Sequence, residues 1–136
     1  MVIATKVWKG PDLFINSNGT TNRKHVKEAL KGSLKRLQLD YVDVVYAHGY
    51  DDETPIEEIC KSFHEVIEDG LAFYWAVSNW DADQIFKAFQ TCEKFNLHKP
   101  IAGQNHYNML VRGEVESEYR KLFEKYNFGI AAYSAL

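Results

Sequence analysis

The sequence is poor in the features that staple a small protein or anchor it in a membrane. It has 2 cysteines in 136 residues, and Cys60 and Cys92 both fall on predicted helix faces rich in apolar residues. This pattern excludes a disulfide framework and predicts two small core residues in a reducing compartment. The longest apolar run, residues 71–77, is far too short to span a membrane. Lys6 interrupts the only apolar start, so we expect no signal peptide and a cytoplasmic protein.

A strong excess of one charge is missing as well. The net charge is −3 at pH 7, which argues against a general nucleic-acid-binding protein. The charges are unevenly placed, because residues 1–40 hold 8 Lys and Arg against 3 Asp and Glu, whereas residues 41–70 hold 1 against 9. We interpret this as a basic helix beside an acidic one, each partly neutralising the other; an interaction patch is the alternative.

Residues 40–48 are the most informative stretch. The run Asp-Tyr-Val-Asp-Val-Val-Tyr-Ala-His is rich in β-branched and aromatic residues and too short for a typical helix, so it predicts a buried strand. It ends in His48, and Gly49 begins a loop. In parallel α/β folds, polar groups at the tips of buried strands carry the chemistry.

Four further predicted strands show the same arrangement. They cover residues 2–6, 71–77, 100–104 and 128–133. Their polar ends are Lys6, Ser78 with Asn79, Gln104 with Asn105, and Tyr133 with Ser134. Five polar strand tips predict one site assembled from many strands.

Helical patterns separate these strands. After a loop at residues 9–21, a helix is predicted over about residues 22–37, with a buried stripe made of Val26, Ala29, Leu30, Ser33, Leu34 and Leu37. The second helix is predicted to start with a capping box, in which Thr54 is the N-cap, Pro55 the first helical residue and Glu57 the reciprocal partner, and to end at Gly70. Asp81 is predicted to cap the third helix, and the fourth covers about residues 116–126.

The resulting order is β-α-β-α-β-α-β-α-β. Strands that alternate with helices imply a parallel sheet, in which all strand carboxyl ends meet at one edge. We therefore expect Lys6, His48, Asn79, Gln104 and Ser134 to share one rim. The length of 136 residues fits one domain but not a complete (β/α)₈ barrel, which needs roughly 250 residues.

Two polar groups carry no predicted chemistry. Asp51, Asp52 and Glu53 form an acidic loop without any spacing that gives a metal-ligand geometry. His64 lies beside the buried stripe of the second helix, which favours a packing or surface role. No metal site is expected.

Five motifs closely resemble the aldo-keto reductase superfamily, and within it the voltage-gated potassium channel β-subunit branch. They are residues 4–6 (Ala-Thr-Lys), 33–43 leading to His48, 74–80 (Tyr-Trp-Ala-Val-Ser-Asn-Trp), 104–107 (Gln-Asn-His-Tyr) and 132–136 (Ala-Tyr-Ser-Ala-Leu). They span the chain in the family's order. The resemblance implies an α/β fold that is a partial (β/α)₈ barrel of TIM type, with residues 1–136 as a single incomplete domain supplying about strands three to seven.

The resemblance also implies a cofactor and a catalytic set. The family binds NADPH at the carboxyl rim and uses Asp, Tyr, Lys and His, of which Lys6 and His48 match the last two. The Asp and Tyr belong to the region before Met1, so this chain alone is expected to be inactive. The positions matched to the cofactor are Ser78, Asn79, Gln104, Tyr133, Ser134 and Leu136, and Trp8 is matched to the substrate pocket.

These residue types suit hydride transfer to a carbonyl carbon, because negative charge then grows on the carbonyl oxygen and hydrogen-bond donors must meet it. In the family the tyrosine donates the proton, the lysine lowers its pKa and the histidine orients the carbonyl. Two positions depart from the family pattern: Ala76 replaces the usual glycine before Ser-Asn, and Ala135 replaces the usual proline.

Three interpretations remain open. The first is part of an NADPH-dependent reductase of aldehydes or ketones, with a small carbonyl compound as partner. The second is an NADPH-sensing β-subunit that binds a potassium channel α-subunit, and the third is a truncated product without activity. Channel β-subunits often carry asparagine at the histidine position, so His48 favours the reductase. A homo-oligomer is compatible with all three, and neither nucleic-acid binding nor direct membrane insertion is expected.

Overall fold

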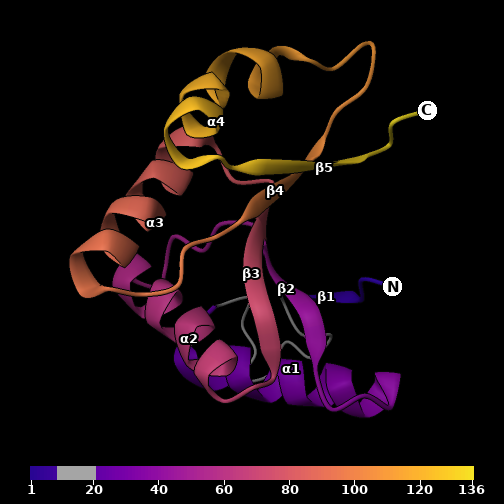
Figure 1. Ribbon diagram of the computed structural model, residues 1–136, viewed down its shortest axis with the longest axis vertical. Coiled ribbons are helices and arrows are strands. Elements are labelled where there is room, and N and C mark those ends of the chain that lie inside the picture. The colour runs from indigo at the N-terminus through magenta and orange to yellow at the C-terminus, as the bar shows by residue number, and fades with distance from the viewer. Residues whose placement is uncertain (9–20) are drawn as a thin grey trace.

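The computed structural model describes residues 1–8 and 21–136 (Figure 1). Within these residues, strands and helices alternate in the predicted order. The strands are β1 Ala4–Val7, β2 Val42–His48, β3 Ala72–Ser78, β4 Ala102–His106 and β5 Gly129–Tyr133. The helices are α1 Arg23–Leu37, α2 Ile56–Glu68, α3 Ala82–Phe95 and α4 Arg120–Tyr126, with a π-helical turn, η1 Glu114–Glu118, before α4. Apart from Thr21, the loop predicted at 9–21 lies outside the described residues.

The strands form a single parallel sheet in the order β1-β2-β3-β4-β5. Sequential order with a helix after each strand is the repeating unit of a TIM-type barrel. In Figure 1 the sheet curves from β1 to β5, and the described helices lie along its outer side. The predicted fold class, an α/β partial TIM-type barrel, is confirmed.

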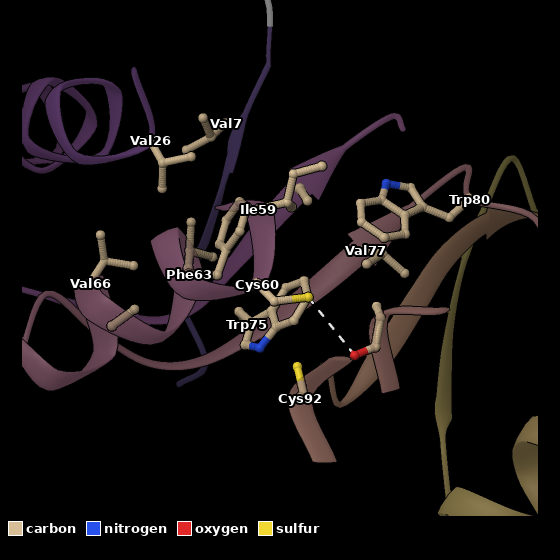
Figure 2. Packing of buried hydrophobic residues seen from close by; sticks show 14 of the residues in the cluster. Val7, Val26, Ile59, Cys60, Phe63, Val66, Trp75, Val77, Trp80 and Cys92 are labelled. Atoms are coloured by element: carbon tan, nitrogen blue, oxygen red, sulfur yellow. Dashed lines mark hydrogen bonds between the residues drawn. The ribbon is translucent and has the colours of Figure 1, made fainter. Parts of the chain in front are cut away.

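The main core lies between the outer face of the sheet and the helices. Phe63 of α2 stacks on Trp75 of β3 with the ring centroids 5.1 Å apart, and both side chains are fully buried. Cys60 and Cys92 are buried in the same core (Figure 2). A hydrogen bond with Cys92, together with burial, raises the pKa of the Cys60 thiol. The prediction that both cysteines are small core residues outside a disulfide is confirmed.

The inner face of the sheet is only partly covered. It carries a small buried cluster made of Val44, Tyr46 and Ala76. Towards the amino end of β3, however, Phe73 is 58% and Tyr74 55% exposed. The apolar run predicted as a strand over residues 71–77 is therefore exposed in this half. Tyr74 is two residues before Ala76 and shares its inner face, whereas the described helices lie along the outer side of the sheet.

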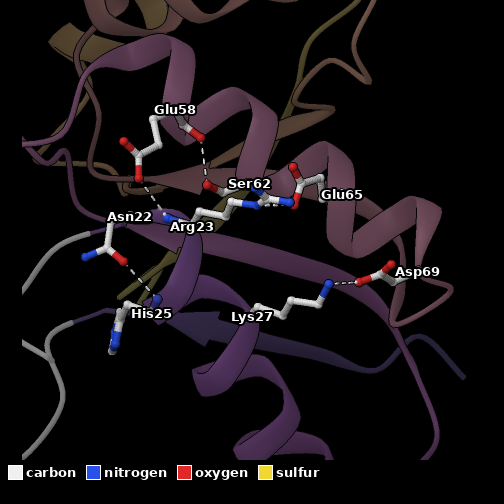
Figure 3. Close-up of polar contacts among 8 residues, drawn as sticks. All are labelled: Asn22, Arg23, His25, Lys27, Glu58, Ser62, Glu65 and Asp69. Atoms are coloured by element: carbon white, nitrogen blue, oxygen red, sulfur yellow. Dashed lines mark hydrogen bonds and ion pairs between the residues drawn. The ribbon is translucent and has the colours of Figure 1, made fainter.

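The uneven charge of the sequence is neutralised between α1 and α2. Arg23 of α1 pairs with Glu65 of α2 at 2.7 Å, and Lys27 pairs with Asp69 at 2.6 Å (Figure 3). The Arg23 backbone amide also donates to the carboxylate of Glu58. The prediction of a basic helix beside an acidic one is confirmed.

The capping box predicted for α2 is wrong. The helix begins at Ile56, its N-cap is Pro55, and no side-chain capping bond is present there. The carboxylate of Asp51 instead organises this loop, since it accepts hydrogen bonds from the amides of Thr21 at 2.6 Å, Glu53 at 3.0 Å and Thr54 at 3.3 Å. Asp51 is only 5% exposed, so it joins the segment before α1 to the loop after β2.

Other helix ends follow the sequence more closely. Asp81 and Gln84 form the capping box of α3, and Gly70 adopts a positive φ of 72° after α2, as expected of a glycine that ends a helix. The predicted fourth helix is divided into the π-helical turn η1 and the α-helix α4. Tyr119 lies between them, as the C-cap of η1 and the N-cap of α4. The stripe predicted for α1 fails at Leu37, which is 44% exposed. Within the described residues, we find no helix with the length and apolar character required to cross a membrane.

Replacing Asp51 with alanine should destabilise the fold. The substitution leaves three backbone amides without their acceptor, and we expect the free energy of unfolding to fall by about 2 kcal/mol. Urea denaturation of the chain measures this difference. The neighbouring Asp52→Ala variant is the control, because Asp52 is exposed and its loss should change stability by less than about 0.5 kcal/mol. Equal effects of the two substitutions would contradict the proposed role of Asp51.

The contribution of Asp51 should also depend on pH. Burial opposes ionisation, yet hydrogen bonds from the Thr54 side chain and from the backbone of Thr21, Glu53 and Thr54 hold the Asp51 pKa below 3.8. A depressed carboxyl pKa stabilises the fold above the unfolded-state pKa, and this stabilisation is lost as the pH falls through the folded-state pKa. The stability difference between the wild type and Asp51→Asn should therefore narrow as the pH is lowered below about 4. A difference that is constant with pH would contradict this.

Candidate active site

The carboxyl ends of the five strands lie along one edge of the sheet, as predicted. In the parallel register Lys6 of β1 is opposite Tyr46 of β2. His48 of β2 is opposite Ser78 of β3, and Ser78 is opposite Gln104 of β4. The sequence predicted this convergence, and the pairing confirms it.

Lys6 and His48 occupy adjacent strands at this edge. The Lys6 ammonium lies 5.6 Å from the centre of the Tyr46 ring. In the register of the sheet, Lys6 is opposite Tyr46, which precedes His48 by two residues on β2. Burial lowers the pKa of the His48 imidazole, and the positive charge of Lys6 lowers it further. Both effects favour the neutral imidazole, which can donate a hydrogen bond without carrying a charge.

Trp8 covers the His48 side of the edge. Its ring centroid lies 6.0 Å from that of His48, and its backbone carbonyl is bonded to the ring of His25 at 2.8 Å. Gly49 makes this placement possible, because a Cβ at residue 49 would lie 2.5 Å from the Trp8 ring, and its φ is 91°. Trp8 and His48 thus form one wall.

The other side of the edge holds amide and hydroxyl groups. Asn79 has a φ of 56°, and its amide Nδ2 donates to Ser78 Oγ at 3.4 Å. The Tyr133 hydroxyl of β5 donates to Asn79 Oδ1 at 2.9 Å, which joins β3 to β5 across β4. Within residues 1–8 and 21–136, the Gln104 side chain forms no hydrogen bond and is half-buried.

The last two predicted positions follow β5. The Ser134 carbonyl accepts a hydrogen bond from Asn108 at 2.9 Å, which ties it to the loop after β4. Leu136, the last residue of the chain, is fully exposed. The structure therefore brings Trp8 next to His48 and Asn79 next to Tyr133, while Leu136 stands apart from the other predicted residues.

This donor set suits a planar carboxamide group. A flat carboxamide needs a donor and acceptors in one plane, and Ser78, Asn79 and Gln104 supply both kinds of group from neighbouring strands. Tyr133 lies beside them and is 39% exposed. Lys6, on β1, adds a positive charge to the same edge of the sheet.

Three residues at the edge escaped the sequence analysis as functional positions. Gly49 was predicted only to begin a loop, although its close approach to Trp8 requires a glycine. His106 stacks on Tyr133 with the ring centroids 5.3 Å apart and the planes 9° apart, and His25 anchors Trp8. A glycine directly after a strand indicates a close backbone approach, so the sequence could have predicted the role of Gly49. No local pattern predicts the contacts of His106 and His25, because their partners are distant in the sequence.

Comparison with known proteins agrees with this geometry. The family model described as "Aldo/keto reductase family" matches residues 1–136. A protein from Oryza sativa subsp. japonica described as a probable voltage-gated potassium channel subunit beta is 43% identical over 139 residues, which cover 100% of this chain and 41% of that protein. Its counterpart of the same description from Arabidopsis thaliana is 44% identical over 137 residues, with 100% and 41% covered.

A third relative, from Schizosaccharomyces pombe, is described as a putative voltage-gated potassium channel subunit beta. It is 42% identical over 135 residues, which cover 99% of this chain and 39% of the relative. The chain thus spans about two fifths of the length of these curated relatives. Since the family model matches every residue and the motifs lie on the strands that carry them, the chain belongs to the aldo/keto reductase family.

Proposed function

We propose that this chain supplies the carboxyl rim of an NADPH-dependent reductase that transfers hydride to the carbonyl carbon of an aldehyde or ketone. The observation that carries the proposal is the placement of Lys6, His48, Ser78, Asn79 and Gln104 along one edge of a parallel sheet. Bound NADPH would supply the hydride. The protein's part is orientation and electrostatics.

His48 is proposed to orient the carbonyl oxygen. Its lowered pKa favours the neutral ring, so a ring N–H can donate to an oxygen on which negative charge develops. Lys6 supplies a fixed positive charge one strand away, and this charge favours the anionic form of any phenol placed beside it. Trp8, against His48, forms a wall of the substrate pocket in this proposal.

The cofactor contacts are proposed for the opposite half of the rim. Ser78, Asn79 and Gln104 would hold the carboxamide and thereby fix which face of the nicotinamide ring is presented. Tyr133 would stack on that ring, and Ser134 and Leu136 would lie near the pyrophosphate. Asn79 is suited to its role because its hydrogen bonds to Ser78 and Tyr133 restrict its side chain.

Two phenols near the rim, those of Tyr46 and Tyr107, are not acidified. Burial raises the pKa of Tyr46, and the hydrogen bond to Glu116 raises that of Tyr107. A general acid works best with a pKa near the operating pH. We therefore propose that residues 1–136 alone do not turn over carbonyl substrates.

A second function is favoured by the comparisons. The three relatives that are 42–44% identical are described as potassium channel β-subunits, so an NADPH-sensing channel subunit is the alternative proposal. Co-purification with a channel α-subunit, in a manner that depends on NADPH, would favour it. Steady-state NADPH oxidation with aldehydes by the longer protein containing this rim would favour the reductase.

Removing the Lys6 charge should raise the pKa of His48. The Coulomb repulsion between the two groups disappears in Lys6→Met, while the burial that also lowers this pKa remains, so the pKa should move towards 6.5 without reaching it. NMR titration of the His48 ring protons measures the change. Lys31→Met, on the exposed side of α1, should leave the His48 pKa unchanged, and an equal shift in both variants would contradict the proposed coupling.

The isolated chain should bind NADPH weakly and show no saturable oxidation of it with an aromatic aldehyde. The physical reason is that the pKa of Tyr46 and of Tyr107 is raised, and loss of general acid catalysis commonly costs about 10²–10⁴-fold in rate. Absorbance of the reduced nicotinamide, followed over a range of aldehyde concentrations, measures the rate. Saturable turnover that is lost in Tyr46→Phe or Tyr107→Phe would contradict the prediction and identify the acid.

Gln104 should contribute to nicotinamide binding. Saturation-transfer NMR with NADPH should show weaker transfer to the nicotinamide protons in Gln104→Ala than in the wild type, since an amide partner of the carboxamide is gone. Gln90→Ala is the matched control, because Gln90 is an exposed glutamine on α3. If Gln104→Ala and Gln90→Ala behave alike, the nicotinamide does not bind at this edge.

A further inference from the structure

A cluster of two histidines and one glutamate lies away from the rim, on the outer surface of the molecule. His64 and Glu68 belong to α2, and His98 follows α3 in the connection to β4. One potential ligand atom from each residue lies within 4.8 Å of the other two. The candidate active site lies at the carboxyl ends of the strands. His98 instead precedes the amino end of β4, so the cluster lies at the opposite end of the sheet.

The helix presents two of these side chains together. His64 and Glu68 are four residues apart, so they lie on the same face of α2 one turn from each other. His64 is half-buried and Glu68 is exposed, which leaves both polar ends at the surface. A His-x-x-x-Glu pair of this kind supplies two ligands from a rigid element.

The third residue is held in place by the core. The backbone carbonyl of His98 accepts hydrogen bonds from the buried Trp75 Nε1 at 2.7 Å and from Cys92 Sγ at 3.3 Å. Its backbone amide donates to His64 Nδ1 at 3.3 Å, and its ring Nε2 lies 2.7 Å from Glu68 Oε1. The backbone of His98 is therefore fixed by interior groups, while its side chain is directed at α2.

Stability alone does not account for this arrangement. The His98–Glu68 pair is exposed, with side-chain exposures of 46% and 60%, and exposed pairs contribute little to folding. The two imidazole rings also lie 4.9 Å apart, which places two potential nitrogen ligands side by side. Two imidazoles and a carboxylate whose ligand atoms converge form a ligand set that suits a transition-metal ion.

We propose that His64, Glu68 and His98 form a binding site for a first-row divalent cation of the Zn²⁺ class. The cation would replace the hydrogen bond between His98 Nε2 and Glu68 Oε1, and the long hydrogen bond accepted by His64 Nδ1. Imidazole nitrogens select such ions over Ca²⁺ and Mg²⁺, which prefer oxygen ligands. The bound ion would tie α2 to the connection between α3 and β4. This site differs from the surface or packing role predicted for His64.

Binding of Zn²⁺ alone, and of Co²⁺ as its spectroscopic substitute, tests the proposal. The metal-free chain is titrated with Zn²⁺ in competition with a chromophoric chelator. We expect one ion per chain, and we expect the dissociation constant to rise by about tenfold or more in each of His64→Asn, Glu68→Gln and His98→Asn, because each variant removes a ligand. Co²⁺ should give visible absorption bands of nitrogen and oxygen coordination.

Matched controls separate this site from other ligands of the chain. His106→Asn removes a histidine elsewhere, and Glu93→Gln removes a glutamate that pairs with Lys99; both should leave Zn²⁺ affinity unchanged. The proposal is overturned if the three site variants bind Zn²⁺ as tightly as the wild type, or if the controls weaken binding equally. A sulfur-to-cobalt charge-transfer band would also overturn it, because Cys60 or Cys92 would then be the ligand.

Discussion

The parallel pairing of β2 with β3 is the constraint on which the rest of the structure depends. In this register Val45 is opposite Trp75, Ala47 opposite Val77 and His48 opposite Ser78. The first two pairs are buried against the helices, and the third stands at the carboxyl edge. Because strand side chains alternate between faces, a slip of one residue would turn the core residues inward and the polar tip outward. The alternation that buries the core therefore also places the candidate active site.

The two faces of the sheet have divided roles as a result. The outer face and the helices hold nearly all of the buried apolar side chains, including the stacked Phe63 and Trp75. The inner face carries the small cluster beside Lys6 and His48. Ala76 belongs to that cluster and is fully buried, so the Cβ that replaces the family's usual glycine is accommodated within it. The proposed reductase site thus lies on the face that the described helices leave free.

The buried Trp75 connects the core with the outer surface. Its indole nitrogen fixes the carbonyl of His98, and His98 then reaches Glu68 on α2. The proposed cation site therefore lies at the opposite end of the sheet from the rim and on its other face. A bound ion there would brace the helical layer without touching the residues proposed to bind NADPH.

Local patterns in the sequence were sufficient for most of the architecture. Alternating apolar runs and helical stripes predicted the order of elements, and the polar strand ends predicted that Lys6, His48 and Gln104 share an edge, because parallel strands place their carboxyl ends together. The paired charges of α1 and α2 also followed from composition. Each of these features depends on local periodicity or on the order of the elements, and both can be derived from the sequence alone.

The features that failed or were missed depend on contacts between distant residues. Thr54 had the local pattern of an N-cap, but its backbone amide donates a hydrogen bond to the Asp51 carboxylate. The amide of Thr21, 30 residues from Asp51 in sequence, donates to the same carboxylate. Phe73 and Tyr74 belong to an apolar run, yet only the arrangement of the helices decides which face is covered. His64 and His98 are separated by a helix and a strand, and only the packing of α2 against α3 brings them together. The sequence by itself determined the elements and their order, because these follow from local periodicity; the tertiary structure decided which polar groups meet, because that depends on packing.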